Sequence, residues 1–106
     1  MQRTVSESRW FSMSLAEQLG NIGCEVGRSA KWQNKDQDLF WGAVIRALDL
    51  FNLTIKDKRW ALRLNEIVRS REIFADAVLG GKEYNTSLLA LEPYFMQFAM
   101  IARKTI

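Results

Sequence analysis

The chain contains no histidine, a single cysteine and a single proline among its 106 residues. The absence of histidine excludes a Ser–His–Asp triad, an imidazole metal ligand and the HExxH zinc motif. It also excludes the usual di-iron carboxylate bundle, which needs two Glu-x-x-His pairs. A lone cysteine forms no intramolecular disulfide and is typical of a reducing compartment. We therefore expect a cytoplasmic protein with no metal site, no cofactor and no enzymatic activity.

Long apolar runs are also missing, since no stretch approaches the roughly 20 residues that cross a bilayer as a helix. The first residues include Glu7 and scattered polar side chains, and they lack the apolar core of a secretory signal. We expect residues 1–13 to form a polar lead-in that is disordered in part, with docking of Trp10 and Phe11 on the core as the alternative. Met13 is an alternative start, which leaves open whether residues 1–12 belong to the native protein.

The composition is that of a globular domain, with 48% hydrophobic and 25% charged residues. The net charge of +3 is spread unevenly along the chain. Residues 36–57 carry two basic and four acidic side chains, which gives −2. Residues 58–80 carry five basic and three acidic side chains, which gives +2. One domain, residues 14–106, is expected at this length.

Helical periodicity and cap residues predict four helices joined by short connections. The first, residues 14–33, begins with a capping-box pattern at Ser14. The second, residues 37–53, follows an aspartate N-cap, either Asp36 or Asp38.

The third helix has the clearest apolar repeat. It follows Asp57 as N-cap and ends at Gly80 and Gly81, as a glycine C-cap would end it. The fourth runs from about residue 87 to 104; Pro93 is unfavourable inside it unless the helix restarts there with the proline at its first position. These elements predict an all-α, up-down-up-down four-helix bundle. The predicted core consists of Leu19, Ile22, Val26, Phe40, Val44, Leu48, Phe51, Trp60, Leu64, Ile67, Phe74, Val78, Phe95 and Phe98.

Small residues line one face of the first predicted helix. They are Ala16, Gly20, Gly23, Cys24, Gly27 and Ala30. Each glycine inside a helix costs about 1 kcal/mol relative to alanine, so three of them need a structural reason. We expect another helix to pack closely on this face, within the chain or across a dimer, and Cys24 to be a buried, inert thiol. A cleft for a ligand is the alternative.

Arg71 interrupts the apolar repeat of the third helix. A charge that faces a core has to be paired, because an unpaired buried charge costs several kcal/mol. Together with its candidate partners it forms a candidate polar ligand site: Glu25, Arg46, Asp49, Arg71, Glu72 and Asp76. The alternatives are a structural ion-pair network and an arginine that reaches the surface. Catalysis by these carboxylates is not expected, since the neighbouring arginines favour salt bridges.

Five basic residues occur in the third segment: Lys58, Arg59, Arg63, Arg69 and Arg71. At 100° per residue they scatter around the helix instead of forming a dense stripe. Nucleic-acid association is therefore an alternative function and not the leading one.

Three stretches resemble a family of small uncharacterised bacterial proteins: Ser14–Gly23, then Arg46–Leu50 with Leu53–Asp57, and Arg69–Glu72. The likeness spans residues 14–103 and implies a bacterial, cytoplasmic origin. The chain is more loosely similar to HEPN-type and diversity-retroelement accessory four-helix proteins. HEPN nucleases use an Arg-x(4–6)-His motif, which a chain without histidine lacks. This likeness implies a non-catalytic member that binds a partner protein or nucleic acid.

These observations predict a protein that acts by binding. Protein–protein interaction, as a homodimer or an adaptor, is the leading hypothesis. A nucleic-acid accessory protein and a bundle that binds a small ligand at the polar cluster are the alternatives.

Overall fold

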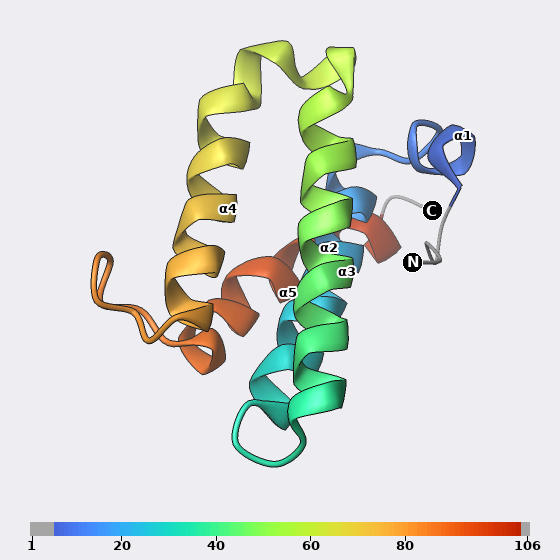
Figure 1. The fold of residues 1–106 in the computed structure, drawn as a ribbon. Helices are drawn as coiled ribbons and strands as arrows, with labels where there is room; N and C mark the ends of the chain where they lie inside the picture. Colours follow the sequence, from blue (N-terminus) through green and yellow to red (C-terminus); the bar gives the residue numbers. More distant parts are fainter. Residues whose placement is uncertain (1–5, 105–106) are drawn as a thin grey trace.

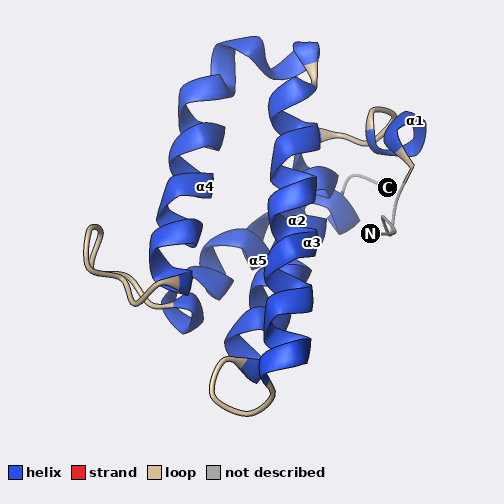
Figure 2. Ribbon diagram, viewed as in Figure 1, coloured by secondary structure: helices blue, strands red, loops and turns tan. Residues whose placement is uncertain are grey.

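Helices account for all regular structure in the part of the chain that is described, residues 6–104 of a computed structural model (Figure 2). Side chains are described from residue 6 to residue 100. The elements are α1 (Glu7–Trp10), α2 (Leu15–Trp32), α3 (Gln37–Lys56), the 3-10 helix η1 (Lys58–Arg63), α4 (Leu64–Val78) and α5 (Leu88–Lys104). The all-α prediction is confirmed for these residues.

The predicted caps of the first two long helices are present. Ser14 Oγ accepts a hydrogen bond from the N–H of Glu17 at 3.1 Å, and the Glu17 carboxylate accepts one from the N–H of Ser14 at 2.9 Å. Asp36 caps α3 by accepting from the N–H of Leu39 at 3.1 Å. These bonds satisfy backbone donors that have no partner inside a helix.

The third predicted helix is divided in two. Asp57 is its N-cap, but it caps the 3-10 helix η1, and the backbone of Trp60 is non-helical (φ −101°, ψ 21°). A 3-10 helix has three residues per turn, so the apolar repeat loses its register before α4 begins. Trp60, within η1, is therefore half-buried, and Leu64, the first residue of α4, is exposed at the edge of that helix's buried stripe.

The long helices pack around α2 (Figure 1). It contacts α3 on one side and α5 on another, whereas α4 lies beside α3 and makes few contacts with α5. In Figure 1, α2, α3 and α4 alternate in direction, and α5 crosses obliquely behind them. This arrangement leaves one broad side of α3 and α4 without a covering helix.

The core is centred on aromatic rings from three helices. The ring centroids of Phe74 and Phe95 each lie 5.9 Å from that of Phe51. Other predicted core residues are also buried: Leu19, Ile22, Val26, Phe40, Val44 and Ile67. Leu48, Val78 and Phe98 are half-buried at the edges.

The lead-in is described from residue 6 onward and contains the short helix α1. Trp10, at the end of α1, is 0% exposed, and its indole N–H donates to Thr54 Oγ1 at 3.1 Å. Residues 1–5 lie outside the described part of the chain. The alternative, in which Trp10 docks on the core, describes this segment correctly.

The last helix does not restart at Pro93, because α5 continues through this residue. The proline lacks an N–H, and its partner in a regular helix would be the carbonyl of Leu89. Both residues are exposed, so solvent reaches the free carbonyl.

Candidate functional site

The residues predicted to form one polar site do not converge; they are Glu25, Arg46, Asp49, Arg71, Glu72 and Asp76. The structure places them in separate groups on α2–α3, on the outer side of α3 and α4, and beside the loop after α4. The three hollows characterised over the described residues are lined by none of them. The geometry therefore gives no support to a ligand site at this cluster.

Glu25 and Arg46 form a structural ion pair between α2 and α3. Glu25 is buried, and its Oε2 accepts hydrogen bonds from Arg28 at 2.9 Å and from Arg46 at 3.2 Å. Its Oε1 is also buried and accepts no hydrogen bond from the described residues. Removing Arg46 would strip a buried carboxylate of one of its two cations, which is costly.

The carboxylates of Glu72 and Asp76 hold the loop that follows α4. Asp76 accepts hydrogen bonds from the backbone N–H groups of Glu83 and Tyr84 at 3.1 and 3.0 Å. Glu72 accepts one from the Tyr84 hydroxyl at 3.1 Å. This bond, which favours the protonated phenol, raises the pKa of Tyr84 above its ordinary value.

Arg71 does not face the core, so of the interpretations left open an arginine that reaches the surface fits it best. The buried side of α4 is defined by Ile67, Phe74 and Ala77, and Arg71 lies at the edge of that stripe. It is half-buried, and its Nε donates to Asn52 Oδ1 on α3 at 3.0 Å. Arg71 is therefore part of the outer surface of the α3–α4 pair.

The small-residue face of α2 packs on α5 over its N-terminal half. A Cβ at Gly20 would lie 2.9 Å from Ala99 Cα, and one at Gly23 would lie 2.6 Å from Phe95 Cβ. Real Cβ atoms essentially never approach so closely, so both positions need glycine for the two backbones to meet. Close helix packing within the chain explains these two glycines.

Cys24, of the predicted small face, lies outside this contact and is exposed, whereas Ala16 is half-buried. The prediction of a buried Cys24 is wrong, because one partner helix covers only part of so wide a face, and Cys24 is turned about 100° from Gly23.

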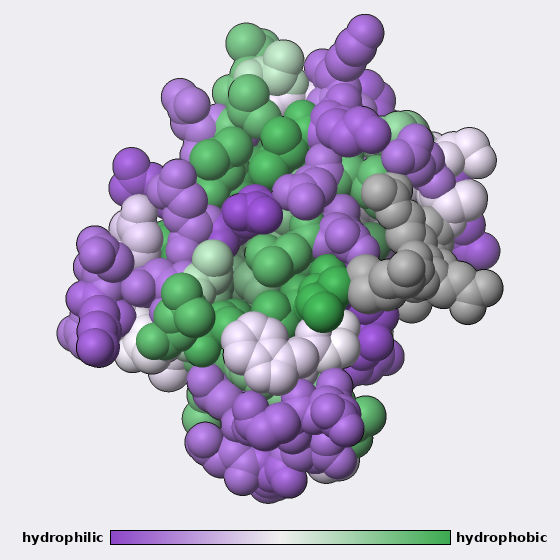
Figure 3. All heavy atoms as spheres, viewed as in Figure 1, coloured by the Kyte–Doolittle hydropathy of each residue, from purple (hydrophilic) through white to green (hydrophobic). Residues whose placement is uncertain are grey.

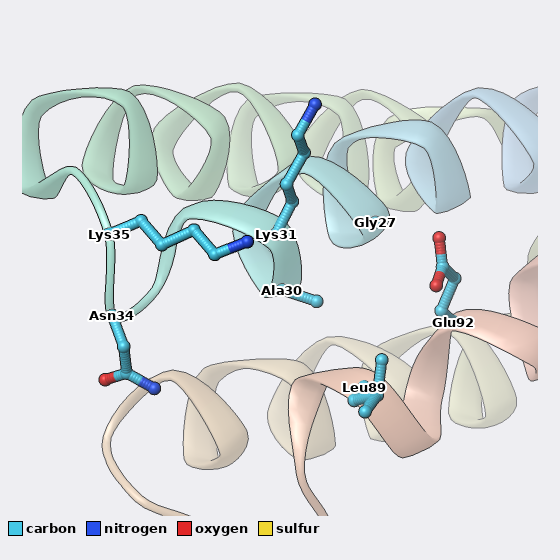
Figure 4. Close-up of a pocket in the computed structure, with 7 residues that line it drawn as sticks. All are labelled: Gly27, Ala30, Lys31, Asn34, Lys35, Leu89 and Glu92. Atoms are coloured by element: carbon cyan, nitrogen blue, oxygen red, sulfur yellow. The ribbon is translucent and has the colours of Figure 1, made fainter.

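The C-terminal half of the same face opens into a pocket of about 430 Å³. It is lined by Gly27, Ala30, Lys31, Asn34, Lys35, Leu89 and Glu92 (Figure 4). In Figure 4, Glu92 points from α5 toward Gly27, and Lys35 extends from the loop toward the pocket, whereas Lys31 points away. The charged side chains are exposed or half-buried, so this pocket is a solvated polar cleft.

A buried polar network that the sequence pattern did not predict joins α1, α2 and η1. Gln18 is fully buried and donates through Nε2 to the carbonyl of Trp10 at 2.9 Å and to Asp57 Oδ2 at 3.1 Å. Its Oε1 accepts from the Trp60 indole N–H at 2.9 Å. Each side-chain polar atom of Gln18 thus has a partner, as buried polar groups require.

Asp57 and Arg59 complete this network. Arg59 donates to the Asp57 carboxylate from Nε at 3.0 Å and from Nη2 at 2.7 Å, and it also donates to the carbonyl of Met13 at 2.7 Å. The hydrogen bonds from Arg59 lower the pKa of Asp57 from 3.8 to about 2. Since every group is engaged, the network is a structural junction. The only signal for it in the sequence was the cap role of Asp57.

Two parallel stripes of mainly apolar residues form the outer side of the α3–α4 pair, which we name the α3–α4 face. On α3 the stripe recurs at helical spacing through Trp41, Ile45, Leu48 and Asn52. On α4 it runs through Leu64, Val68, Arg71, Ala75 and Leu79, the last being the C-cap. All nine residues are exposed or half-buried, and Trp41 and Ile45 are 44% and 41% exposed.

The space-filling view shows the same side of the molecule (Figure 3). Hydrophobic groups gather over α3 and α4 above and below a polar break. The hydrogen bond between Asn52 and Arg71 crosses from α3 to α4 within the face. The face is therefore apolar with one polar crossing.

An apolar groove of about 370 Å³ lies between α4 and α5. Ile73, Leu91, Tyr94 and Phe95 supply its apolar surface. It results from the sparse contact between these two helices.

The basic residues of η1 and α4 are only partly free. Arg59 pairs with Asp57 and Arg63 with Glu66. Two of the five cations are thus offset by carboxylates, which weakens a continuous phosphate-binding stripe.

No protein-family model, curated protein or solved structure matches this chain. Among the described residues, no group of three or more Cys, Asp or Glu side chains is placed to hold a metal ion. No helix of residues 6–104 is long and apolar enough to span a bilayer. The functional argument therefore depends on the surface itself.

Proposed function

We propose that this protein acts by binding another protein surface through the α3–α4 face, as a homodimeric or adaptor module and not as an enzyme. The observation that carries the proposal is the pair of parallel apolar stripes, with Trp41 and Ile45 at more than 40% exposure. Contiguous apolar patches rimmed by polar groups mark interaction sites, whereas single exposed apolar residues need no explanation.

The size of the face is sufficient for such a contact. Helices of 20 and 15 residues are about 30 and 22 Å long, and two helices side by side are about 20 Å wide. The face therefore offers about 500 Å² per partner, or about 1,000 Å² in total, which reaches the lower range of specific interfaces. The exposed tryptophan matches the aromatic enrichment of interface hot spots.

Two further assignments belong to this proposal. We place the protein in the bacterial cytoplasm, on the resemblance of residues 14–103 and the single cysteine. We also classify its topology as an up-down-up-down bundle, for which the alternating directions of α2, α3 and α4 are the support. The oblique α5 is a distortion of that bundle, and it leaves the α3–α4 face uncovered.

A matched pair of variants tests the role of the face. Ile45→Asp places a charge within the α3–α4 face, and Leu89→Asp places one on an exposed residue of α5 outside it. Both are compared with the parent by sedimentation velocity and by affinity capture from native cell extract, with thermal unfolding as the control for folding. We expect Ile45→Asp to lose self-association or partner capture and Leu89→Asp to keep it. Equal association of both variants would contradict the proposal, as would a parent that associates with nothing.

A further inference from the structure

Two charged side chains on or beside the α3–α4 face have no ion-pair partner among the described residues. Arg71 hydrogen-bonds through Nε to Asn52 and makes no ion pair with the described residues. Asp49, on α3, makes neither a hydrogen bond nor an ion pair with them. Both side chains are half-buried.

These groups lie close together along the helices. Asp49 is three residues before Asn52, so about 4.5 Å of helix rise separates it from the level at which Arg71 crosses to α3. It is also four residues after Ile45, which makes it a neighbour of the exposed apolar stripe. The carboxylate of Asp49 and the guanidinium of Arg71, neither of which has an ion-pair partner in the described part of the chain, therefore flank the same apolar surface at nearly the same level.

From this arrangement we propose that the partner on the α3–α4 face is a second copy of this chain. The two copies are related by a two-fold axis parallel to α3 and α4, and Arg71 of each copy pairs with Asp49 of the other. This inference rests on the proposed function of the face and adds its occupant and its geometry.

The geometry follows from symmetry. A two-fold axis in the interface plane and parallel to the helices places α3 of one copy over α4 of the other and keeps each residue at its level. In such an isologous contact, any pair formed once is formed twice. Arg71 thus meets the partner's Asp49 on one side of the axis, and Asp49 meets the partner's Arg71 on the other.

Charge complementarity favours a second copy over an apolar partner. Covering Arg71 with an apolar surface would leave a buried charge unpaired, which costs several kcal/mol, so the partner has to supply a carboxylate. A second copy supplies such a carboxylate, because its Asp49 lies at nearly the same level and has no partner within the described residues. An unrelated acidic protein is the competing occupant.

Complementary charge reversals test this pairing. In a homodimer of Asp49→Arg, two arginines face each other at both contacts, and in a homodimer of Arg71→Asp two aspartates do. Mixing the two variants restores an Arg–Asp pair at both contacts, as does the double variant Asp49→Arg/Arg71→Asp. Glu83→Arg, in the exposed loop after α4, is the control for reversal of an acidic residue outside the face.

Sedimentation equilibrium gives the dimer Kd, and native mass spectrometry identifies the heterodimer in the mixture. We expect each single reversal to raise the Kd at least tenfold, and the mixture, the double variant and Glu83→Arg to dimerise within threefold of the parent. Single reversals that dimerise like the parent, or a mixture that stays monomeric, overturn the pairing. If Ile45→Asp loses the dimer in that case, the α3–α4 face is still supported as the binding surface. A monomeric parent that captures another protein through Ile45 overturns the second copy and leaves the proposed function standing.

Discussion

Small residues lie at both ends of α2, but at one end they allow close helix packing and at the other they line an open pocket. At the N-terminal end, Gly20 and Gly23 let α5 approach until a Cβ on Gly23 would lie 2.6 Å from Phe95 Cβ. At the C-terminal end, Gly27 and Ala30 line a solvated pocket of about 430 Å³. A small residue therefore marks a close approach only where the second helix arrives with its backbone, and it marks open space where only a flexible side chain arrives.

We call the N-terminal end of α2, where α5 packs closely, the closed end and the C-terminal end the open end. The stability of the closed end is expected to depend most on Trp10. Replacing this fully buried residue with alanine removes its packing and its hydrogen bond to Thr54. We expect Trp10→Ala to lower the free energy of unfolding by about 3–5 kcal/mol in urea denaturation. The control variant Leu62→Ala, at a fully exposed residue outside the α3–α4 face, should cost less than about 1 kcal/mol. If the two costs are equal, the closed end does not depend on docking of α1.

Overpacking at Gly23 is the next largest effect. A leucine here would collide with the Cβ of Phe95 and with its backbone carbon, which a Gly23 Cβ would already approach to 3.3 Å. We expect Gly23→Leu to destabilise the protein by about 3 kcal/mol in the same assay. Gly42→Leu serves as the control, since a Cβ at Gly42 meets only the tip of the Arg46 side chain. A Gly23→Leu protein as stable as the parent would show that this half of the face is open too.

Acid should loosen the closed end through Asp57. The pKa of this buried carboxyl is lowered from 3.8 to about 2 in the folded protein, so folding favours its charged form. Its contribution, about 2 kcal/mol, is therefore complete above pH 3.8 and is lost as the pH falls through about 2. We expect Asp57→Asn to be less stable than the parent by about this amount at pH 7 and to converge with it near pH 2. A constant difference across this range would contradict the role of the ion pair with Arg59.

The smallest effect is expected at the open end. A Cβ on Gly27 meets the carboxylate tip of Glu92, which is free to swing into the pocket, and alanine is the better helix former by about 1 kcal/mol. We expect Gly27→Ala to be as stable as the parent or more stable by up to about 1 kcal/mol in thermal and urea unfolding. Gly23→Ala, in contrast, should be destabilised. Equal effects of the two substitutions would remove the distinction between the two ends.

Local sequence signals predicted the elements whose causes are local. The caps at Ser14 and Asp36 and the glycines after α4 depend on neighbours a few residues away, and they are present as expected. Gly80 and Gly81 both have positive φ, at 115° and 74°, which a glycine adopts without strain.

The candidate sites were predicted less well, because their causes are long-range. Arg71 was assigned to a core seam from its spacing, but the buried stripe of α4 is centred on Ile67, Phe74 and Ala77, which leaves Arg71 at its edge, bonded to Asn52. The hydrogen bonds from Gln18 to the Trp10 carbonyl and to Asp57 were not predicted. Gln18 and Asp57 are far apart in the chain, so no local sequence pattern indicates that they meet.

The sequence by itself determined an all-helical chain, the caps at Ser14 and Asp36, most of the apolar core and the need for a close approach at the glycines of α2. Only the tertiary structure decided which glycines are covered, where Arg71 points and which helix face is left without a partner. The physical reason is that hydrogen bonds and caps act over one helical turn, whereas packing depends on the angle at which whole helices meet. The oblique course of α5 closes one end of α2 and opens the other, and it leaves the α3–α4 face uncovered.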